Sequence, residues 1–169
     1  LIPHLFDSLN MIHGREMTVL GEVGFVSMGF DRSSCYHLQP DSFNPLAPFI
    51  FEGIGKDQII GDFGLIVGGA AGLEIDRAEA RLGTPPHALV VASSAWEHSD
   101  VYRVTLEDLA YNSPIATGTT SELVRADMVF FETANGGGVF SVGSITWCGS
   151  LAHNDYDNNL SRITENVLR

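Results

Sequence analysis

The last third of the chain, residues 136–169, constrains the fold more than any other stretch. Residues 139–147 alternate and are rich in β-branched and aromatic side chains, which predicts a strand buried on at least one face. A polar loop follows at 150–158, and then a short helix with Asn158 or Asn159 as its N-cap. A strand, a polar loop and a helix in this order favour an α/β fold, in which ligands bind beyond the carboxyl ends of the strands.

Further strands are predicted along the rest of the chain. Residues 87–93, HALVVAS, give the clearest buried strand. Other segments with strand composition are 49–54, 100–106, the second half of 121–133 and, as a bent strand at best, 17–30. Residues 109–120 are predicted to be a loop, and residues 2–12 are consistent with the end of a helix. No internal repeat or linker-like break is present, so residues 1–169 are expected to belong to one domain.

Charge and cysteine content exclude some classes of protein. Nine Lys and Arg face 21 Asp and Glu, a formal net charge of -12, which repels a phosphate backbone and argues against nucleic-acid binding. No apolar run approaches the roughly 18 residues of a membrane span. Cys35 and Cys148 lie far apart without a partner motif, so two buried free thiols in a cytoplasmic protein are predicted, with a disulfide as the alternative.

The first residues, LIPHLFDSLNM, carry no initiator Met and already lie within an amphipathic pattern. We therefore expect the chain to be the ordered part of a longer polypeptide, with some of the active site outside it. Made alone, such a chain is expected to have low solubility and no catalytic activity, because its sheet would have an uncovered edge.

Acidic side chains close to glycines are the first catalytic candidates. Glu74 and Asp76 follow the glycine run 68–72, and on an extended segment both carboxylates would share one face, where desolvation favours a general base. The alternatives are acids that face solvent or pair with a nearby arginine. The glycine run lacks P-loop and dinucleotide-site spacing, so close backbone packing explains it better. Glu52, within the apolar segment 49–54, is predicted to be a buried, paired acid.

His98 is the second catalytic candidate. It follows the predicted strand 87–93 and so lies near the carboxyl end of that strand, where catalytic groups collect. Ser93, Ser94 and Glu97 lie close by, as in a hydrolase triad, but the Gly-x-Ser-x-Gly elbow is missing. The alternative is a surface or capping role for His98.

Metal-ligand spacing is not evident. No HxH, HExxH or H-x-D pattern links the histidines, which argues against a zinc site made wholly within this chain: His4, His13, His37, His87, His98 and His153. The four tyrosines are possible ligands of a hard metal with Glu, but no local pattern supports this, so the metal ligands stay unknown: Tyr36, Tyr102, Tyr111 and Tyr156. Cys148 is predicted to be buried in a strand and not to be a nucleophile.

Several long motifs carry a resemblance to a known family. The string GGGVFSVGSITWCGSLAHNDYDNNLSRITENVLR is similar to the carboxyl terminus of the large, catalytic subunit of the N,N-dimethylformamidase family. The similarity continues through PFIFEGIG, IIGDFGL, GGAAGLEIDRAEARLGTPPHALVVASS and EHSDVY. It covers most of the chain after Phe49 and is weaker before that residue.

This resemblance implies a fold, an activity and partners. The implied fold is a flavodoxin-like, glutamine-amidotransferase-like three-layer α/β sandwich, of which the chain would be an incomplete C-terminal part. The implied activity is hydrolysis of a tertiary formamide to formate and an amine at a mononuclear iron held by two tyrosines and a glutamate. The resemblance also implies that those iron ligands precede Leu1. The implied partners are the rest of the large subunit and a small subunit, in an oligomer.

The resemblance also gives Glu74 a role. In the GLEID motif it resembles a family carboxylate beside the metal, which implies that Glu74 deprotonates the attacking water while iron acts as a Lewis acid. Two alternatives remain. In the first alternative, the chain is a catalytically inactive, amidotransferase-like domain that serves structure or subunit contact. In the second, it belongs to a relative whose substrate is not a formamide.

Overall fold

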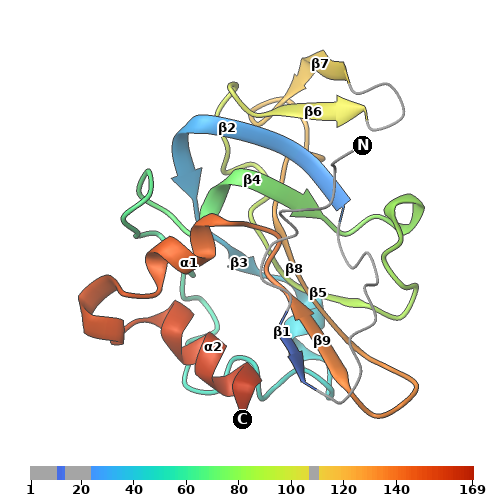
Figure 1. The fold of residues 1–169 in the computed structure, drawn as a ribbon, viewed down its shortest axis with the longest axis vertical. Coiled ribbons are helices and arrows are strands. Elements are labelled where there is room, and N and C mark those ends of the chain that lie inside the picture. The colour runs from blue at the N-terminus through green and yellow to red at the C-terminus, as the bar shows by residue number, and fades with distance from the viewer. Residues whose placement is uncertain (1–10, 14–23, 107–110) are drawn as a thin grey trace.

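The computed structural model describes residues 11–13, 24–106 and 111–169, and antiparallel strands dominate it (Figure 1). The strands are β1 Met11–His13, β2 Gly24–Ser34, β3 His37–Leu38, β4 Ala71–Arg77, β5 Leu89–Ser93, β6 Arg103–Leu106, β7 Tyr111–Thr117, β8 Asp127–Glu132 and β9 Gly138–Ser141. The α-helices are α1 Thr146–Ser150 and α2 Asn159–Leu168, and the short 3₁₀ turns are η1 Pro40–Phe43, η2 Ala80–Leu82 and η3 His153–Tyr156.

The described strands form three sheets. A five-stranded sheet has the order β1-β9-β8-β5-β3, while β2 pairs with β4 and β6 pairs with β7. Every one of these pairs is antiparallel. Figure 1 shows the β6–β7 hairpin at one end of the molecule and α2 at the other, with the β2–β4 pair between them.

The predicted flavodoxin-like, amidotransferase-like α/β sandwich is therefore wrong. Such a fold needs parallel strands joined by helical crossovers, whereas every described strand pair here is antiparallel. The pattern that suggested this fold is the strand, loop and helix in residues 136–169. Helix α2 is the last element that the structure describes, so no described strand completes a parallel βαβ unit with it. A terminal helix on an antiparallel sheet has the same local pattern as a βα unit.

Several predictions of individual strands are confirmed. The predicted strand 87–93 contains β5, and the predicted strand 139–147 contains residues 139–141 of β9. Both strands pair with β8, so their near-neighbour placement is confirmed. The second half of 121–133 contains β8, and 100–106 contains β6. However, β9 ends at Ser141, and residues 146 and 147 begin a helix.

Two predictions of local structure are wrong. The predicted loop 109–120 contains strand β7, and the predicted strand 49–54 forms turns. The Asn166 side chain on α2 donates to the carbonyls of Ile50 and Glu52 at 3.1 and 2.9 Å, so a side chain satisfies backbone groups that a strand would pair. Ile50 is buried, whereas Glu52 is exposed and not the buried acid that we expected.

The N-terminal helix prediction, 2–12, falls mostly outside the described residues. Its last two residues, Met11 and Ile12, belong to strand β1. In the prediction for 17–30, residues 24–30 belong to β2, and the earlier part also lies outside the described residues.

Helix α2 closes the main core as its sequence predicts. The Asn158 side chain caps the helix by accepting from the Ser161 N–H at 2.9 Å. Its face of Leu160, Ile163 and Val167 is buried, and the Thr164 hydroxyl lies 3.2 Å from the indole N–H of the buried Trp147. This packing fixes α2 against α1.

The glycine run 68–72 serves close backbone packing, as predicted. A Cβ atom on Gly69 would clash with the carbonyl of Ser34, and one on Gly72 would clash with Ser33. The run therefore lets the start of β4 lie directly against the end of β2.

Both cysteines are free, which confirms unpaired thiols, but neither is buried. Cys35 is partly buried, while Cys148 is exposed on α1 and not within a strand. Of the helices that the structure describes, none is long and apolar enough to cross a membrane.

Candidate functional site

The loop 94–102, which follows β5, carries most of the polar chemistry near the end of β2. Ser94 at its start is fully buried, and its hydroxyl oxygen accepts from the Ala126 N–H at 2.7 Å. The same oxygen lies 2.7 Å from Nε2 of His98. Arg32 at the end of β2 donates to the carbonyl of Glu97 at 3.3 Å, and Ser99 donates to the Asp31 carboxylate. The loop is therefore attached to β2 at several points.

His98 lies inside this loop with only 2% of its surface exposed. Its ring centroid is 4.8 Å from that of Tyr102, and its Nδ1 atom has no hydrogen-bond partner among the described residues. Burial, and then the Arg32 guanidinium, lowers the pKa of His98 from 6.5 to about 4. His98 is therefore a buried neutral imidazole and not a surface or capping residue.

The Ser–His–acid triad that the residues around His98 suggest, although the sequence lacks its elbow motif, is not assembled among the described residues. No carboxylate hydrogen-bonds Nδ1 of His98, because Glu97 pairs with His37 instead at 3.2 Å. Ser94 is fully buried and cannot be reached by a substrate in this conformation. The Ser94–His98 pair thus holds the loop to the segment before β8.

We expect the free energy of unfolding to decrease as the pH falls from 6.5 towards 4. Folded His98 stays neutral down to a pKa of about 4, whereas the unfolded chain takes up this proton near pH 6.5. The unfolded state therefore binds more protons in this window, and acid favours it. Urea unfolding across the window measures the decrease, and His98→Gln should make it smaller. An equal decrease in both proteins would assign the effect to other groups.

Tyr102 connects His98 to the other catalytic candidate, Glu74. Its hydroxyl accepts from the Leu73 N–H at 3.0 Å and donates to the carbonyl of Arg32 at 3.1 Å. Leu73 has a φ of 57°, a left-handed conformation that costs energy in a non-glycine residue and that this hydrogen bond helps to hold. The hydrogen bond from Leu73 to Tyr102 therefore holds the backbone directly before Glu74 in place.

Glu74 lies in β4 directly opposite Met28 of β2, so the two side chains share a face. Its carboxylate is partly exposed and makes no hydrogen bond or ion pair with any described residue. Asp76, which we expected on the same face, is buried at 7% exposure. Of the two acids, only Glu74 is placed to meet a small molecule.

The structure also gathers three residues that sequence spacing had not connected. The Cys35 sulfur lies 3.9 Å from Nε2 of His37, and the same nitrogen lies 3.2 Å from Oε1 of Glu97. Burial, then the Glu97 charge, raises the pKa of the Cys35 thiol. Residues two apart on an extended chain point to the same side, so the Cys-x-His spacing was the available signal. Nothing in the sequence brings in Glu97.

The three tyrosines whose side chains the structure describes do not fit an iron site of two phenolates and a glutamate. Tyr36 and Tyr102 are both buried and donate to backbone carbonyls, Tyr36 to Val142 at 2.8 Å. Burial raises the pKa of both tyrosines, to about 12 for Tyr102, and both hydroxyls already hydrogen-bond to backbone groups. Tyr156 is exposed on η3. Among the side chains that the structure describes, no pair of tyrosines meets a glutamate as an iron ligand set.

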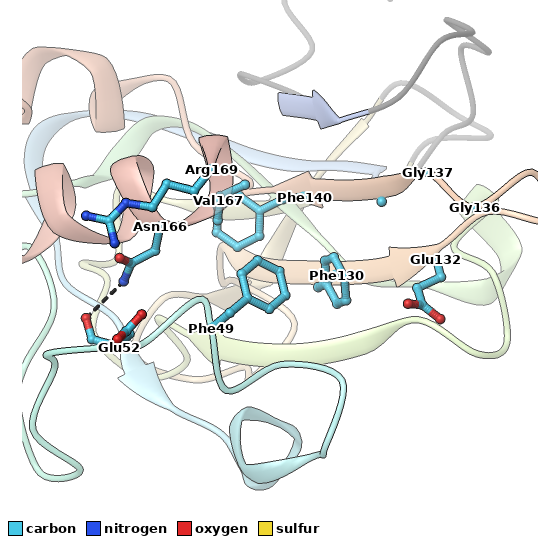
Figure 2. A pocket seen from close by; sticks show the side chains of 11 residues that line it. Phe49, Glu52, Phe130, Glu132, Gly136, Gly137, Phe140, Asn166, Val167 and Arg169 are labelled. Carbon is cyan, nitrogen blue, oxygen red and sulfur yellow. Dashed lines mark hydrogen bonds between the residues drawn. The ribbon is translucent and has the colours of Figure 1, made fainter.

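Figure 2 shows an apolar hollow of about 400 Å³ beside the C-terminal end of α2. The rings of Phe49, Phe130 and Phe140 line it, with Glu52 and Glu132 towards opposite ends. It includes neither Glu74 nor His98. It can accept an apolar group, but its lining offers no nucleophile.

The polar loop 150–158 also borders a hollow of about 440 Å³, which lies between residues 153–159 and residues 58–63. The His153 ring stacks on Phe63 with 4.2 Å between the centroids. The predicted polar loop is therefore present, but it does not follow the carboxyl end of a parallel strand.

Comparison with known proteins shows which family the sequence resembles. Residues 10–158 match the model described as N,N-dimethylformamidase beta subunit-like, C-terminal. The chain is 51% identical over 145 residues to the "N,N-dimethylformamidase beta subunit" of Paracoccus aminophilus and 50% identical over 145 residues to that of Alcaligenes sp.. These matches cover 86% of this chain but only 19% of each relative, so the chain spans about a fifth of their length.

Proposed function

The chain belongs to the N,N-dimethylformamidase beta subunit-like, C-terminal family, and on this premise we propose that it works as part of an amidohydrolase that cleaves a tertiary formamide. The observation that carries the proposal is the identity of about half over 145 residues. The relatives are named as beta subunits, so our expectation of the large, catalytic subunit is corrected to the beta subunit.

In this proposal Glu74 is the general base. Its carboxylate takes a proton from a water molecule whose oxygen attacks the formamide carbon, the C–N bond breaks, and the amine leaves with a proton while formate remains. An unpaired, partly exposed carboxylate on a fixed strand suits this role. We assign His98 to positioning, because its buried ring packs on Tyr102, which holds the backbone beside Glu74.

The iron implied by the resemblance has no ligand set among the described side chains. We propose that residues outside this chain hold it. The contribution of this chain would then be a carboxylate and its supporting structure. Its two free cysteines are consistent with the cytoplasmic location that we propose.

A second function, subunit contact, is supported by an exposed apolar strip on β2. Phe25, Met28 and Phe30 are 39, 46 and 68% exposed. Exposed apolar side chains that adjoin on one strand mark contact surfaces in many proteins. We propose that the strip packs against the rest of a beta subunit or another subunit of an oligomer. Met28 lies opposite Glu74, so such a contact would also cover the proposed base.

The test compares the formamide hydrolysis of two samples. One is the complete polypeptide that carries this chain, together with its partner subunits, and the other is residues 1–169 alone. We expect the complete protein to convert N,N-dimethylformamide to formate and dimethylamine in equal amounts, and residues 1–169 to show no turnover above a no-protein control. If the complete protein hydrolyses no formamide, the contact function is favoured. Turnover by residues 1–169 alone would contradict our placement of iron outside the chain.

A further inference from the structure

We propose that Cys35, His37 and Glu97 form a binding site for one divalent transition-metal ion of the Zn²⁺ class. This site is separate from the iron of the proposed function, because its donors are a thiol, an imidazole and a carboxylate and not tyrosines. It also revises the sequence-based expectation that no zinc site lies within the chain.

The geometry suits a single ion. Sγ of Cys35 and Nε2 of His37 are 3.9 Å apart, Nε2 and Oε1 of Glu97 are 3.2 Å apart, and all three ligand atoms lie within 4.8 Å of one another. Ligand bonds of about 2.0 to 2.3 Å in a tetrahedral zinc site place the donor atoms roughly 3.3 to 3.8 Å apart. Small side-chain rotations therefore bring all three donors to one ion.

The backbone that carries the first two donors is rigid. Between them, Tyr36 exchanges hydrogen bonds with Ile60, at 2.8 and 3.0 Å, and its buried hydroxyl donates to Val142 at 2.8 Å. With Tyr36 fixed towards the core, Cys35 and His37 both point to the opposite side of the extended chain. The pair is thus positioned before any ion binds.

The third donor comes from a separate segment that is also held in place. The Glu97 N–H donates to the carbonyl of Ser94 at 3.2 Å, and Arg32 donates to the Glu97 carbonyl at 3.3 Å. Arg32 contacts the main chain of Glu97, and the only described hydrogen bond of the carboxylate is to His37. A bound ion would therefore link the end of β2 to the loop 94–102.

Charge and access also favour a cation. The negative charges of Glu97 and Asp62 both act on Cys35, so they attract a cation to its sulfur. A metal ion that binds there displaces the thiol proton and takes the thiolate as its ligand. The side chains of His37 and Glu97 are 44 and 40% exposed, so an ion can enter from solvent and keep one water as its fourth ligand.

The test is a Co²⁺ titration of the complete protein after its exchangeable metal has been removed with a chelator. Thiolate coordination gives a sulfur-to-cobalt charge-transfer band in the near ultraviolet, which does not depend on catalytic activity. We expect one equivalent of Co²⁺ to produce the band, Zn²⁺ to abolish it and bound ion to raise the thermal midpoint. Cys35→Ser should remove the band, and His37→Gln or Glu97→Gln should weaken binding by about 10-fold or more.

Cys148→Ser and His87→Gln are the matched controls, because both residues are exposed and lie outside the cluster. Both should keep the band and the affinity. The difference spectrum between wild type and Cys35→Ser isolates this site from any other metal in the protein. A band that persists in Cys35→Ser, or no cobalt-dependent difference between the two proteins while both remain folded by circular dichroism, overturns the proposal.

Discussion

The Glu74→Gln variant of the complete enzyme is expected to lower kcat by about 10²-fold, the usual scale for the loss of a general base. Glutamine keeps the size and hydrogen-bonding capacity of the side chain but cannot accept the proton of the attacking water. Glu74 has no described ion pair whose loss would disturb the fold, so the thermal midpoint and the metal content should stay unchanged. Formate release at saturating N,N-dimethylformamide measures kcat.

Glu122→Gln is the control for this experiment. Glu122 is exposed, and its described hydrogen bond is made by its main-chain carbonyl and not by its side chain. Glu79 on the segment after β4 is less suitable, because its carboxylate lies 3.7 Å from the guanidinium of Arg77. Near-normal kcat in Glu74→Gln would make Glu74 a structural residue, and loss of metal would make it a ligand. Either result rules out the general-base assignment.

The Asp127→Ala variant should lose about 3 to 5 kcal/mol of stability, the cost of removing one partner of a buried ion pair. Asp127 on β8 is fully buried and accepts from Arg125 Nε at 2.9 and 3.0 Å. The Ser93 hydroxyl donates to the same carboxylate at 2.7 Å, and the Ala78 N–H at 2.9 Å. Alanine leaves all three donors without this acceptor. The free energy of unfolding in urea measures the loss.

Glu165→Ala is the comparison for Asp127. Glu165 also pairs with arginines, Arg162 and Arg169, but its side chain is 53% exposed, so water screens the pairs and little change is expected. If Asp127→Ala fails to fold, Asp127→Asn keeps part of the acceptor set and should show an intermediate loss. Equal stability of the Asp127 and Glu165 variants would show that the buried carboxylate contributes nothing beyond a surface pair.

Local structure was predictable where a short segment determines it. Helix α2 was found because Asn158 caps it and its apolar residues recur at helical spacing. Strands β5 and β8 were found because buried strands have a dense apolar composition. The sheet order was not predictable, since β1 and β9 pair across most of the chain. Without knowledge of pairing, a strand followed by a helix was read as part of a parallel sheet.

The candidate site shows the same limit. Glu74 was proposed because it adjoins a glycine run and apolar neighbours within a few residues, and its catalytic role stays a prediction. The burial of His98 was missed, because it depends on Tyr102 and on the segment before β8. The grouping of Cys35, His37 and Glu97 was missed because Glu97 lies 60 positions after His37. Contacts of this kind depend on the whole fold.

The outer position of β1 in the five-stranded sheet has a consequence for biosynthesis. About 125 residues separate β1 from β9, its sheet neighbour. At a synthesis rate of about 5 to 20 residues per second, the ribosome needs on the order of ten seconds to deliver that neighbour. Until then the strand has no edge to join, and such long-range pairing also folds slowly. Strand β1 therefore completes the five-stranded sheet only after β9 has been synthesised.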